Sequence, residues 1–282
     1  MVWSPFGKSK AQKELAKILR GQQIPSFPGI VHKVLELLRD PDVDFDEIVS
    51  QLQWDPHLTV QLLKTVNSAA YGLAHPISDV KHAVGFLGRA SLEQIVLGLA
   101  VRNLLPHGDA PGFDAARYWR TASYRAALAR GIAHDLHPAK EAECFTAALL
   151  QDLAIPVLVH ALPGPYGAVL GRWHGSPEGT LQEMERKALG WSHDEVGGLI
   201  CEHWDLPEDL ARGIATHHTD AEDRLLPALK LVAIIPETEA TWTDARLVRT
   251  GLAEYGIAEE AMLAHIQTAK SQAHKLSRSL AA

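Results

Sequence analysis

The amino-acid sequence predicts an all-α protein. Apolar residues recur at helical spacing through most of the chain, and no stretch shows sustained alternation of apolar and polar residues. Proline, glycine and acidic residues interrupt these runs where helices are expected to begin or end. The chain has 282 residues, of which 46% are apolar and 22% are charged, as is typical of a globular protein with a substantial core. At this length we expect two packed helical units.

Composition limits the partners and the compartment. The formal net charge of −7 argues against a nucleic-acid partner, which would favour a basic surface. The first ten residues lack the apolar stretch of a signal peptide, and no later run approaches membrane-spanning length, so we expect a cytoplasmic protein without a membrane partner. Cys144 and Cys201 have no CxxC spacing and are expected to be buried thiols.

The N-terminal part is expected to form several short helices. Asp44 and Asp55 are predicted to cap two of them, and Ser78 and Ser91 two more. The helix that follows Asp55 is expected to end at Gly72. The segment "PHGDAPGFD" at 106–114 concentrates Pro, Gly and Asp and marks the expected boundary. We therefore predict three parts: an N-terminal extension at 1–21, a first bundle at 22–105 and a second bundle at 112–282.

The second bundle is predicted to begin with helices at about 115–136, 141–161 and 180–189. Ser192 and Glu195 have the spacing of a capping box and are expected to open a helix that continues to about Trp204. A further helix is expected to end at His217 and His218, and about three more follow Leu225. Three tryptophans are expected in the core: Trp119, Trp191 and Trp204.

A carboxylate and three imidazoles form the candidate site. Asp152 lies in the apolar run "FTAALLQDLA", which we interpret as a helix. His193 is placed near the start of a later helix, and His217 and His218 near the end of the next one. Such a set from separate helices suits a divalent ion, either zinc or non-haem iron or manganese.

At these residues the chain resembles the HD superfamily of helical metal phosphohydrolases. The segment "SHDEVGGLICEHWDLPEDLARGIATHH" is similar to the HxxVG…LxxxWxLP…HH order of that superfamily. The segment "DPHLTVQLLKTVNSAAYG" resembles the DPxLxxxLLxxxNSAxYG signature of its HDOD branch, the HD-related output domain. The resemblance covers about residues 22–220. It implies a helical bundle packed on an HD-like bundle, in a bacterial regulatory setting often linked to two-component or cyclic-dinucleotide pathways.

The resemblance also implies a degenerate metal site. Thr121 stands where the first metal-binding histidine of the HD pattern would be, and Gln151 stands where the histidine of the His-Asp pair would be. Neither side chain is a good ligand beside imidazole or carboxylate. We therefore expect no dinuclear site, no cofactor, and no second shell or phosphate-binding cations. We expect no bound metal ion. If a single ion does bind, its ligands would be Asp152, His193, His217 and His218.

Other residues have two interpretations each. The literal His-Asp pairs at 134–135 and 193–194 are expected to be solvated helix ends. Asn67 and Ser68 could close a helix, or Asn67 could bond buried backbone between the two bundles. Tyr71 is either an interaction anchor or a residue packed between the bundles.

These observations favour a non-catalytic bacterial signalling module. It would act by binding a partner protein of unknown identity, as a component of a pathway such as a cyclic di-GMP pathway. The alternative is a metal-dependent phosphohydrolase of nucleotides or cyclic dinucleotides with a reduced ligand set. The sequence shows no GxSxG elbow and no phosphate-cradling Gly-Lys loop.

Overall fold

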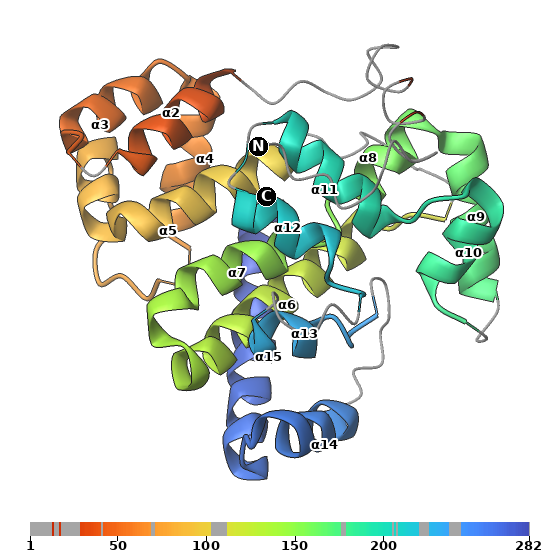
Figure 1. The fold of residues 1–282 in the computed structure, drawn as a ribbon. Coiled ribbons are helices and arrows are strands. Elements are labelled where there is room, and N and C mark those ends of the chain that lie inside the picture. The colour runs from red at the N-terminus through yellow and green to blue at the C-terminus, as the bar shows by residue number, and fades with distance from the viewer. Residues whose placement is uncertain are drawn as a thin grey trace. The chain divides into compact units, whose positions relative to one another are not determined.

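The computed structural model describes residues 13, 17, 29–40, 42–68, 71–102, 112–175, 179–204, 206, 208–219, 226–236 and 244–281. Every regular element among these residues is a helix, so the predicted all-α fold is confirmed (Figure 1). The expected extension at 1–21 lies almost wholly outside the described residues, as does 106–111 of the expected boundary segment.

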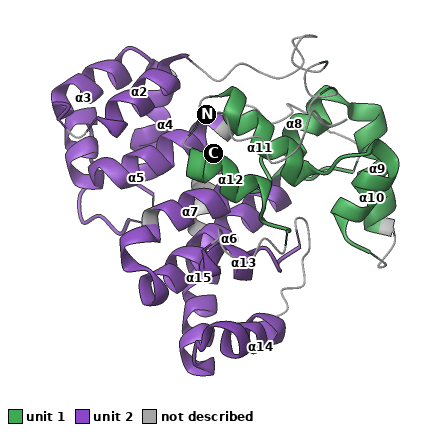
Figure 2. Cartoon of the chain, in the orientation of Figure 1, with its two compact units in different colours: residues 1–25, 104–115, 151–225 green, residues 26–103, 116–150, 226–282 purple. Residues whose placement is uncertain are grey.

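The chain forms two compact units, and it passes between them several times (Figure 2). Unit 1 comprises residues 1–25, 104–115 and 151–225, and unit 2 comprises residues 26–103, 116–150 and 226–282. This division differs from the two consecutive bundles expected from the sequence. The reason is that segments far along the chain return to pack on the N-terminal helices of unit 2, a tertiary choice that no local pattern encodes.

Unit 2 contains the N-terminal helices and the C-terminal ones. Its α7 packs on α5, α13 packs on α7, and α15 packs on α4 and α5. The helices are α2 (Gly29–Arg39), α3 (Phe45–Gln53), α4 (Pro56–Val66), α5 (Val80–Arg102), α6 (Ala115–Leu136, apart from its first residue), the short 3-10 turn η1 (Pro138–Lys140), α7 (Glu141–Leu150), α13 (Pro227–Val232), α14 (Asp244–Tyr255) and α15 (Glu259–Ala281).

Two of the four predicted caps in unit 2 are confirmed. Asp44 accepts a hydrogen bond from the backbone N–H of Asp46 at 3.0 Å, and Asp55 accepts one from Leu58 at 3.0 Å. The other two are wrong. Asp79 rather than Ser78 caps α5, by accepting from the N–H of His82 at 2.8 Å. Ser91 lies inside α5.

The path of the chain around α4 and α5 also differs from expectation. Helix α4 ends at Val66 instead of Gly72. The two expected helices, at 79–88 and 92–105, are joined into α5 over the residues described, with a single non-helical residue, Gly88, between them. Gly88 has φ +69°, a left-handed conformation that glycine adopts without the steric penalty of a side chain.

Asn67 holds the turn after α4. Its amide N–H donates to the carbonyl of Ile77 at 2.7 Å, and its carbonyl oxygen accepts from the N–H of Ile77 at 2.7 Å. The amide also donates to the carbonyl of Leu63 at 2.9 Å. Asn67 thus bonds backbone within unit 2, and it closes the helix and fixes the following loop at once.

Two stretches are long and apolar enough to cross a membrane by length and composition: Val80–Ala100 and Glu143–Ala161. The expectation that no run reaches this length is therefore wrong. The second stretch is 94% buried within the protein and the first 56% buried. Neither is one uninterrupted helix, because Gly88 breaks the first and a turn at residues 151–153 breaks the second. Extensive burial is typical of core helices.

Unit 1 contains the helices that carry the candidate site. Its α11 packs on α8 and α12, while α9 packs on α8 and α10. The helices are α8 (Ala154–Ala161), α9 (Pro163–Gly175), α10 (Leu181–Leu189), α11 (His193–His203) and α12 (Glu208–Ala215).

Helix α9 is absent from the sequence-based prediction. The segment "PGPYG" that opens it reads as a chain breaker, but proline is tolerated in the first turn of a helix, where no N–H partner is needed. The single helix expected at 141–161 is in fact α7 and α8, separated by the turn that contains Asp152.

Helices α11 and α12 pack closely because glycines face α12. A Cβ atom at Gly198 would lie 2.5 Å from the Cβ of Ala215, and one at Gly197 would lie 2.8 Å from a methyl group of Ile214. Real Cβ atoms do not approach so closely, so the absence of side chains allows this approach. The packing sets the ends of α11 and α12 that carry the histidines.

Candidate metal centre

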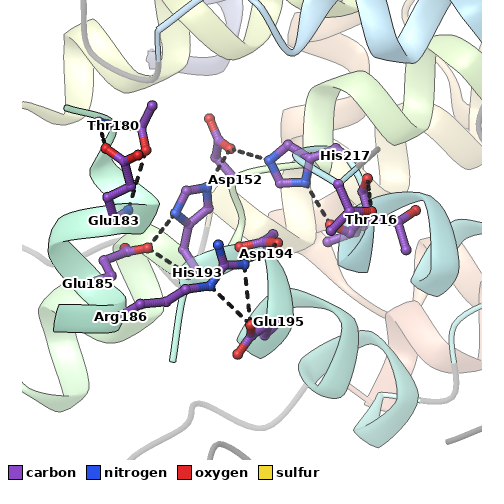
Figure 3. A network of polar contacts seen from close by, with 12 residues as sticks. Asp152, Thr180, Glu183, Glu185, Arg186, His193, Asp194, Glu195, Thr216 and His217 are labelled. Carbon is purple, nitrogen blue, oxygen red and sulfur yellow. Dashed lines mark hydrogen bonds and ion pairs between the residues drawn. The ribbon is translucent and has the colours of Figure 1, made fainter. Parts of the chain in front are cut away.

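Asp152, His193, His217 and His218, the residues to which the sequence limited any site for one ion, lie together in unit 1. One ligand atom from each lies within 4.8 Å of every other. Asp152 comes from the turn between α7 and α8, His193 begins α11, and the other two follow the end of α12. The expectation that Asp152 is on a helix is wrong. Its place in a turn directs the carboxylate at the histidines (Figure 3).

One oxygen of Asp152 faces two imidazoles. The Oδ1 atom is 3.4 Å from Nε2 of His193 and 3.2 Å from Nε2 of His217. The His217 and His218 rings have centroids 3.9 Å apart, and the His193 and His218 centroids are 5.2 Å apart. Three imidazoles and a carboxylate therefore converge on one small volume.

His193 is fixed from the side opposite Asp152. Its Nδ1 atom lies 2.8 Å from Oε2 of Glu185, and its backbone N–H donates to the same oxygen at 2.8 Å. The other oxygen of Glu185 accepts a hydrogen bond from the hydroxyl of Tyr166 at 2.5 Å. A carboxylate accepts from Nδ1–H, so Nε2 is the nitrogen that His193 presents toward Asp152. Figure 3 shows the ring between the two carboxylates.

His217 is fixed in the same way by backbone. Its Nδ1 atom lies 2.6 Å from the carbonyl oxygen of Ile214, which accepts the hydrogen bond. The Nε2 atom is consequently the nitrogen with a lone pair. It is buried, and no described group forms a hydrogen bond with it. Outer contacts of this kind, present at His193 and His217, are typical of metal-binding histidines. The expectation that a second shell is missing is therefore wrong.

The four residues fit a single divalent ion. With ligand bonds of 2.0–2.1 Å, two ligands of a tetrahedral ion are separated by about 3.3 Å. The separations of 3.4 and 3.2 Å from Asp152 Oδ1 to the two Nε2 atoms match that spacing. Imidazole nitrogen and carboxylate oxygen suit zinc, iron or manganese. Bound there, such an ion would supply positive charge and would link three segments of unit 1: the turn before α8, the start of α11 and the residues after α12.

A proton competes with a metal ion for the same position. Burial on its own would lower the pKa of His193, but the carboxylates of Glu185 and Asp152 outweigh it and raise that pKa well above its ordinary value. Without an ion, His193 is therefore an imidazolium between two carboxylates. Metal binding would displace the proton on Nε2.

Asp194 is buried, although the sequence suggested a solvated helix end. Its side chain is fully enclosed, and Oδ2 lies 3.7 Å from a guanidinium nitrogen of Arg186. Burial would raise its pKa, but the charge of the neighbouring His193 imidazolium outweighs burial and lowers it. The pair at 134–135, by contrast, is exposed as expected. Position within a helix does not reveal burial, because the neighbouring α10 covers this helix end.

The predicted Ser192–Glu195 capping box is wrong. Ser192 occupies the N-cap position of α11 without a side-chain bond, and Glu195 instead accepts from Arg186 at 3.3 Å. In place of a capping box, the Glu185 carboxylate accepts a hydrogen bond from the backbone N–H of His193. The box that does form is in α10, between Thr180 and Glu183.

The two departures from the HD pattern are both buried. Gln151 precedes Asp152 in the same turn. Thr121 lies on α6 in unit 2. The remaining candidates, Asn67, Ser68 and Tyr71, also belong to unit 2. Tyr71 is partly buried and contacts the ring of Phe86 edge-on, with centroids 6.1 Å apart.

Other predictions about buried residues are confirmed. Trp119, Trp191 and Trp204 are each at most 4% exposed. Cys144 and Cys201 are free buried thiols, and burial raises the pKa of Cys144 to about 12.

Glu185 and Tyr166 were missed by the sequence reasoning. Glu185 lies on α10 eight positions before His193 along the chain, and Tyr166 lies on α9. The signal available was an acid on the apolar face of "LQEMERKAL", a position where a charged residue needs a buried partner.

The fold and the site define an HD-type helical protein with a carboxylate–histidine cluster. The chain belongs to the HDOD domain family, whose profile matches residues 24–220.

Known proteins share this fold over nearly their full length. An HDOD domain protein of unknown function from Geobacter sulfurreducens is 22% identical, with a TM-score of 0.76 over 95% of this chain and 97% of that one. A protein from Shewanella amazonensis SB2B, provisionally named a phosphohydrolase, gives the same identity and TM-score over 94% of this chain and 97% of that one. At this identity the likeness shows the fold alone.

A curated relative from Treponema pallidum (strain Nichols), named an uncharacterized protein, is 25% identical over 219 residues. The match covers 76% of this chain but 42% of the relative.

Proposed function

We propose that this chain is a regulatory module that acts by binding a partner protein, and that its HD-type cluster holds one divalent ion in a closed, non-catalytic site. The observation that carries this proposal is the burial of four protein ligand atoms around one position. Membership of the HDOD family and the signalling setting that the family resemblance implies support the regulatory part.

The closed site argues against turnover. Catalytic zinc sites keep three protein ligands and leave a position for water, whereas structural sites use four protein ligands. Here the Oδ1 atom of Asp152 and the Nε2 atoms of His193, His217 and His218 each expose less than 1 Å². A tetrahedral zinc ion held by all four would have no open position for water, and burial of the ligand atoms argues against access by a bulky phosphate ester to any ion held there.

The nearest charged neighbours support the same conclusion. Phosphoryl transfer relies on cations that bind the phosphate oxygens. The guanidinium of Arg186 lies next to the site. It forms ion pairs with Glu195 at 3.2 Å and with Asp194 at 3.7 Å. Its charge is thus already matched by two carboxylates.

Partner binding needs a surface, and Tyr71 with Phe86 offers one candidate. Phe86 is 46% exposed on α5, and its ring meets that of Tyr71 edge-on. Exposed aromatic pairs are frequent anchors in protein interfaces. We propose that the partner is a signalling protein, for which a component of a cyclic-dinucleotide pathway is the first candidate.

The test combines metal loading with an activity assay. The full chain is incubated with Zn²⁺ or Mn²⁺, freed of excess ion by gel filtration, and analysed for bound metal and for hydrolysis of cyclic di-GMP and of a chromogenic phosphodiester. We expect one ion per chain and no turnover. Absence of bound ion would refute the metal site, and metal-dependent turnover that His217→Ala abolishes would refute the non-catalytic role.

The binding part has its own test. Purified chain is titrated with a candidate signalling protein, such as a cyclic di-GMP pathway enzyme from the same cell, and with the variant Phe86→Ala as comparison. Saturable binding that Phe86→Ala weakens, while its melting temperature is kept, supports the surface. Equal affinity of the two chains would exclude this surface from the interaction.

A further inference from the structure

Glu185 is a fully buried acid in the middle of α10. Three donors converge on its carboxylate: the backbone N–H and Nδ1 of His193 on Oε2, and the hydroxyl of Tyr166 on Oε1. A buried carboxylate is costly unless its oxygens are hydrogen-bonded, and these contacts meet that requirement. The arrangement keeps an ionised acceptor behind the His193 ring.

The contacts of Glu185 hold both the backbone and the ring of His193. Since Oε2 receives the first N–H of α11, the carboxylate fixes where that helix begins. Since the same oxygen receives Nδ1–H, it also fixes which nitrogen faces Asp152. One atom therefore determines the position and the tautomer of the ring.

Tyr166 connects this arrangement to a third helix. Its side chain is fully buried on α9, and its hydroxyl donates to Glu185 at 2.5 Å. A hydrogen bond to a charged acceptor is shorter and stronger than one between neutral groups. The chain of contacts thus runs from α9 through α10 to the first residue of α11; Figure 3 shows its part from Glu185 to His193.

We infer that Glu185 is the positioning residue that makes His193 a metal ligand, and that it links occupancy of the metal position to the packing of α9 and α10 on α11. This inference rests on the proposed metal site. A carboxylate that accepts from Nδ1–H strengthens Nε2 as a ligand, and such outer-shell partners commonly change metal affinity by about 10–100-fold.

The substitution that isolates this role is Glu185→Gln. Glutamine has nearly the same shape, and its amide oxygen accepts from His193 while its NH₂ faces the Tyr166 oxygen, but it carries no charge. The matched control is Glu183→Gln on the same helix, because among the described residues Glu183 hydrogen-bonds the exposed N-cap residue Thr180 and lies away from His193 in the contacts of α10. A second variant, Tyr166→Phe, leaves Glu185 in place and removes one donor.

Two measurements are made on the full chain: Co²⁺ affinity by competition with a chelator, and the position of the His193 Nδ1–H resonance by ¹H and ¹⁵N NMR of the imidazole. We expect Glu185→Gln to weaken Co²⁺ binding by about 10–100-fold and Tyr166→Phe by a smaller factor. In both, the Nδ1–H resonance of His193 should shift in the metal-free protein, because the acceptor of its hydrogen bond is altered. Glu183→Gln should match the unaltered chain.

The outcomes separate the inference from the proposal beneath it. If the unaltered chain binds no Co²⁺, the proposed metal site fails, and the inference fails with it. If the unaltered chain binds Co²⁺ and both Glu185→Gln and Tyr166→Phe bind it equally well, only the role of Glu185 is overturned. If Glu185→Gln does not fold, Tyr166→Phe decides: unchanged Co²⁺ affinity with an unchanged His193 Nδ1–H resonance overturns the inference.

Discussion

The Nε2 atom of His217 lies 3.2 Å from Oδ1 of Asp152, although the two residues come from the segment after α12 and the turn before α8. Nδ1 of His217 is occupied by the carbonyl of Ile214, so only Nε2 faces the acid. This pairing of a fixed imidazole with a carboxylate is the geometric core of the proposed metal site.

Replacing His217 should remove the ion. His217→Ala deletes one of four ligands. The Zn²⁺ affinity should therefore fall by more than the roughly 10–100-fold expected of an outer-shell substitution, and the purified variant should retain little Zn²⁺. Elemental analysis after gel filtration measures this. His203→Ala, which removes an exposed histidine at the end of α11, is the control and should keep the ion. Equal metal content in the two variants would contradict the assignment of His217.

Metal should stabilise the fold in a concentration-dependent way. An ion that binds only the folded chain at 100 times its Kd contributes about 2.7 kcal/mol to the free energy of unfolding. The melting temperature should therefore rise on adding Zn²⁺ and return on adding a chelator, as followed by calorimetry. Asp152→Asn should remove most of this response. A melting temperature that is indifferent to Zn²⁺ would count against the site.

The close packing of α11 and α12 should be sensitive to one methyl group. In Gly198→Ala the new Cβ would lie 2.5 Å from the Cβ of Ala215, so the helices must separate, at about 1–3 kcal/mol of unfolding free energy. Urea denaturation measures the change. Gly171→Ala on α9 is the matched control, because no atom lies within 4 Å of its added methyl, and it should stabilise by about 0.4–1 kcal/mol. A neutral Gly198→Ala would refute the packing.

Asn67 should contribute to stability through Ile77. Asn67→Ala leaves the N–H and C=O of the buried Ile77 without the side-chain partners they now have, which should cost about 1–3 kcal/mol. Ser68→Ala is the neighbouring control, since the Ser68 hydroxyl makes no hydrogen bond to the part of the chain that the structure describes, and its effect should stay within about 0.5 kcal/mol. Similar denaturation midpoints for both variants would contradict this role.

His134 should titrate at higher pH than a free histidine. Its hydrogen bond to Glu141 at 2.7 Å, and then the charge of that carboxylate, raise the pKa of His134. Because the folded pKa exceeds the unfolded one, the stabilisation is complete below the unfolded pKa and is lost as pH rises through the folded pKa. NMR titration should show the pKa of His134 falling in Glu141→Gln and unchanged in Glu143→Gln, whose carboxylate bonds Lys140. Identical titration curves for the two variants would refute the pairing.

The helical class and several helix starts follow from local sequence. Apolar periodicity is a property of neighbouring residues, so it predicts helices correctly without knowledge of the fold. Asp44 and Asp55 cap as predicted, because an N-cap bonds a backbone N–H two or three residues ahead. The four members of the metal cluster were also found from sequence, through their match to a family motif, and the structure brings the same four together.

Errors arose where a tertiary neighbour overrides a local signal. Ser192 and Glu195 have the spacing of a capping box. In the structure, however, the first N–H of α11 donates to Glu185, and Glu195 accepts a hydrogen bond from Arg186 instead. Asp194 has the local setting of a solvated helix end, yet it is buried beside α10. Proximity between distant segments is not encoded in spacing along the chain.

The sequence by itself thus determined the all-α class, most helix positions and the identity of the residues that could hold an ion. Only the tertiary structure decided that Asp152 lies in a turn, that its ligand neighbours are buried, and that Glu185 with Tyr166 stands behind His193. The physical reason is that helix propensity and capping act over a few residues. Burial, tautomer and ligand geometry, in contrast, depend on which helices pack together and which water they exclude.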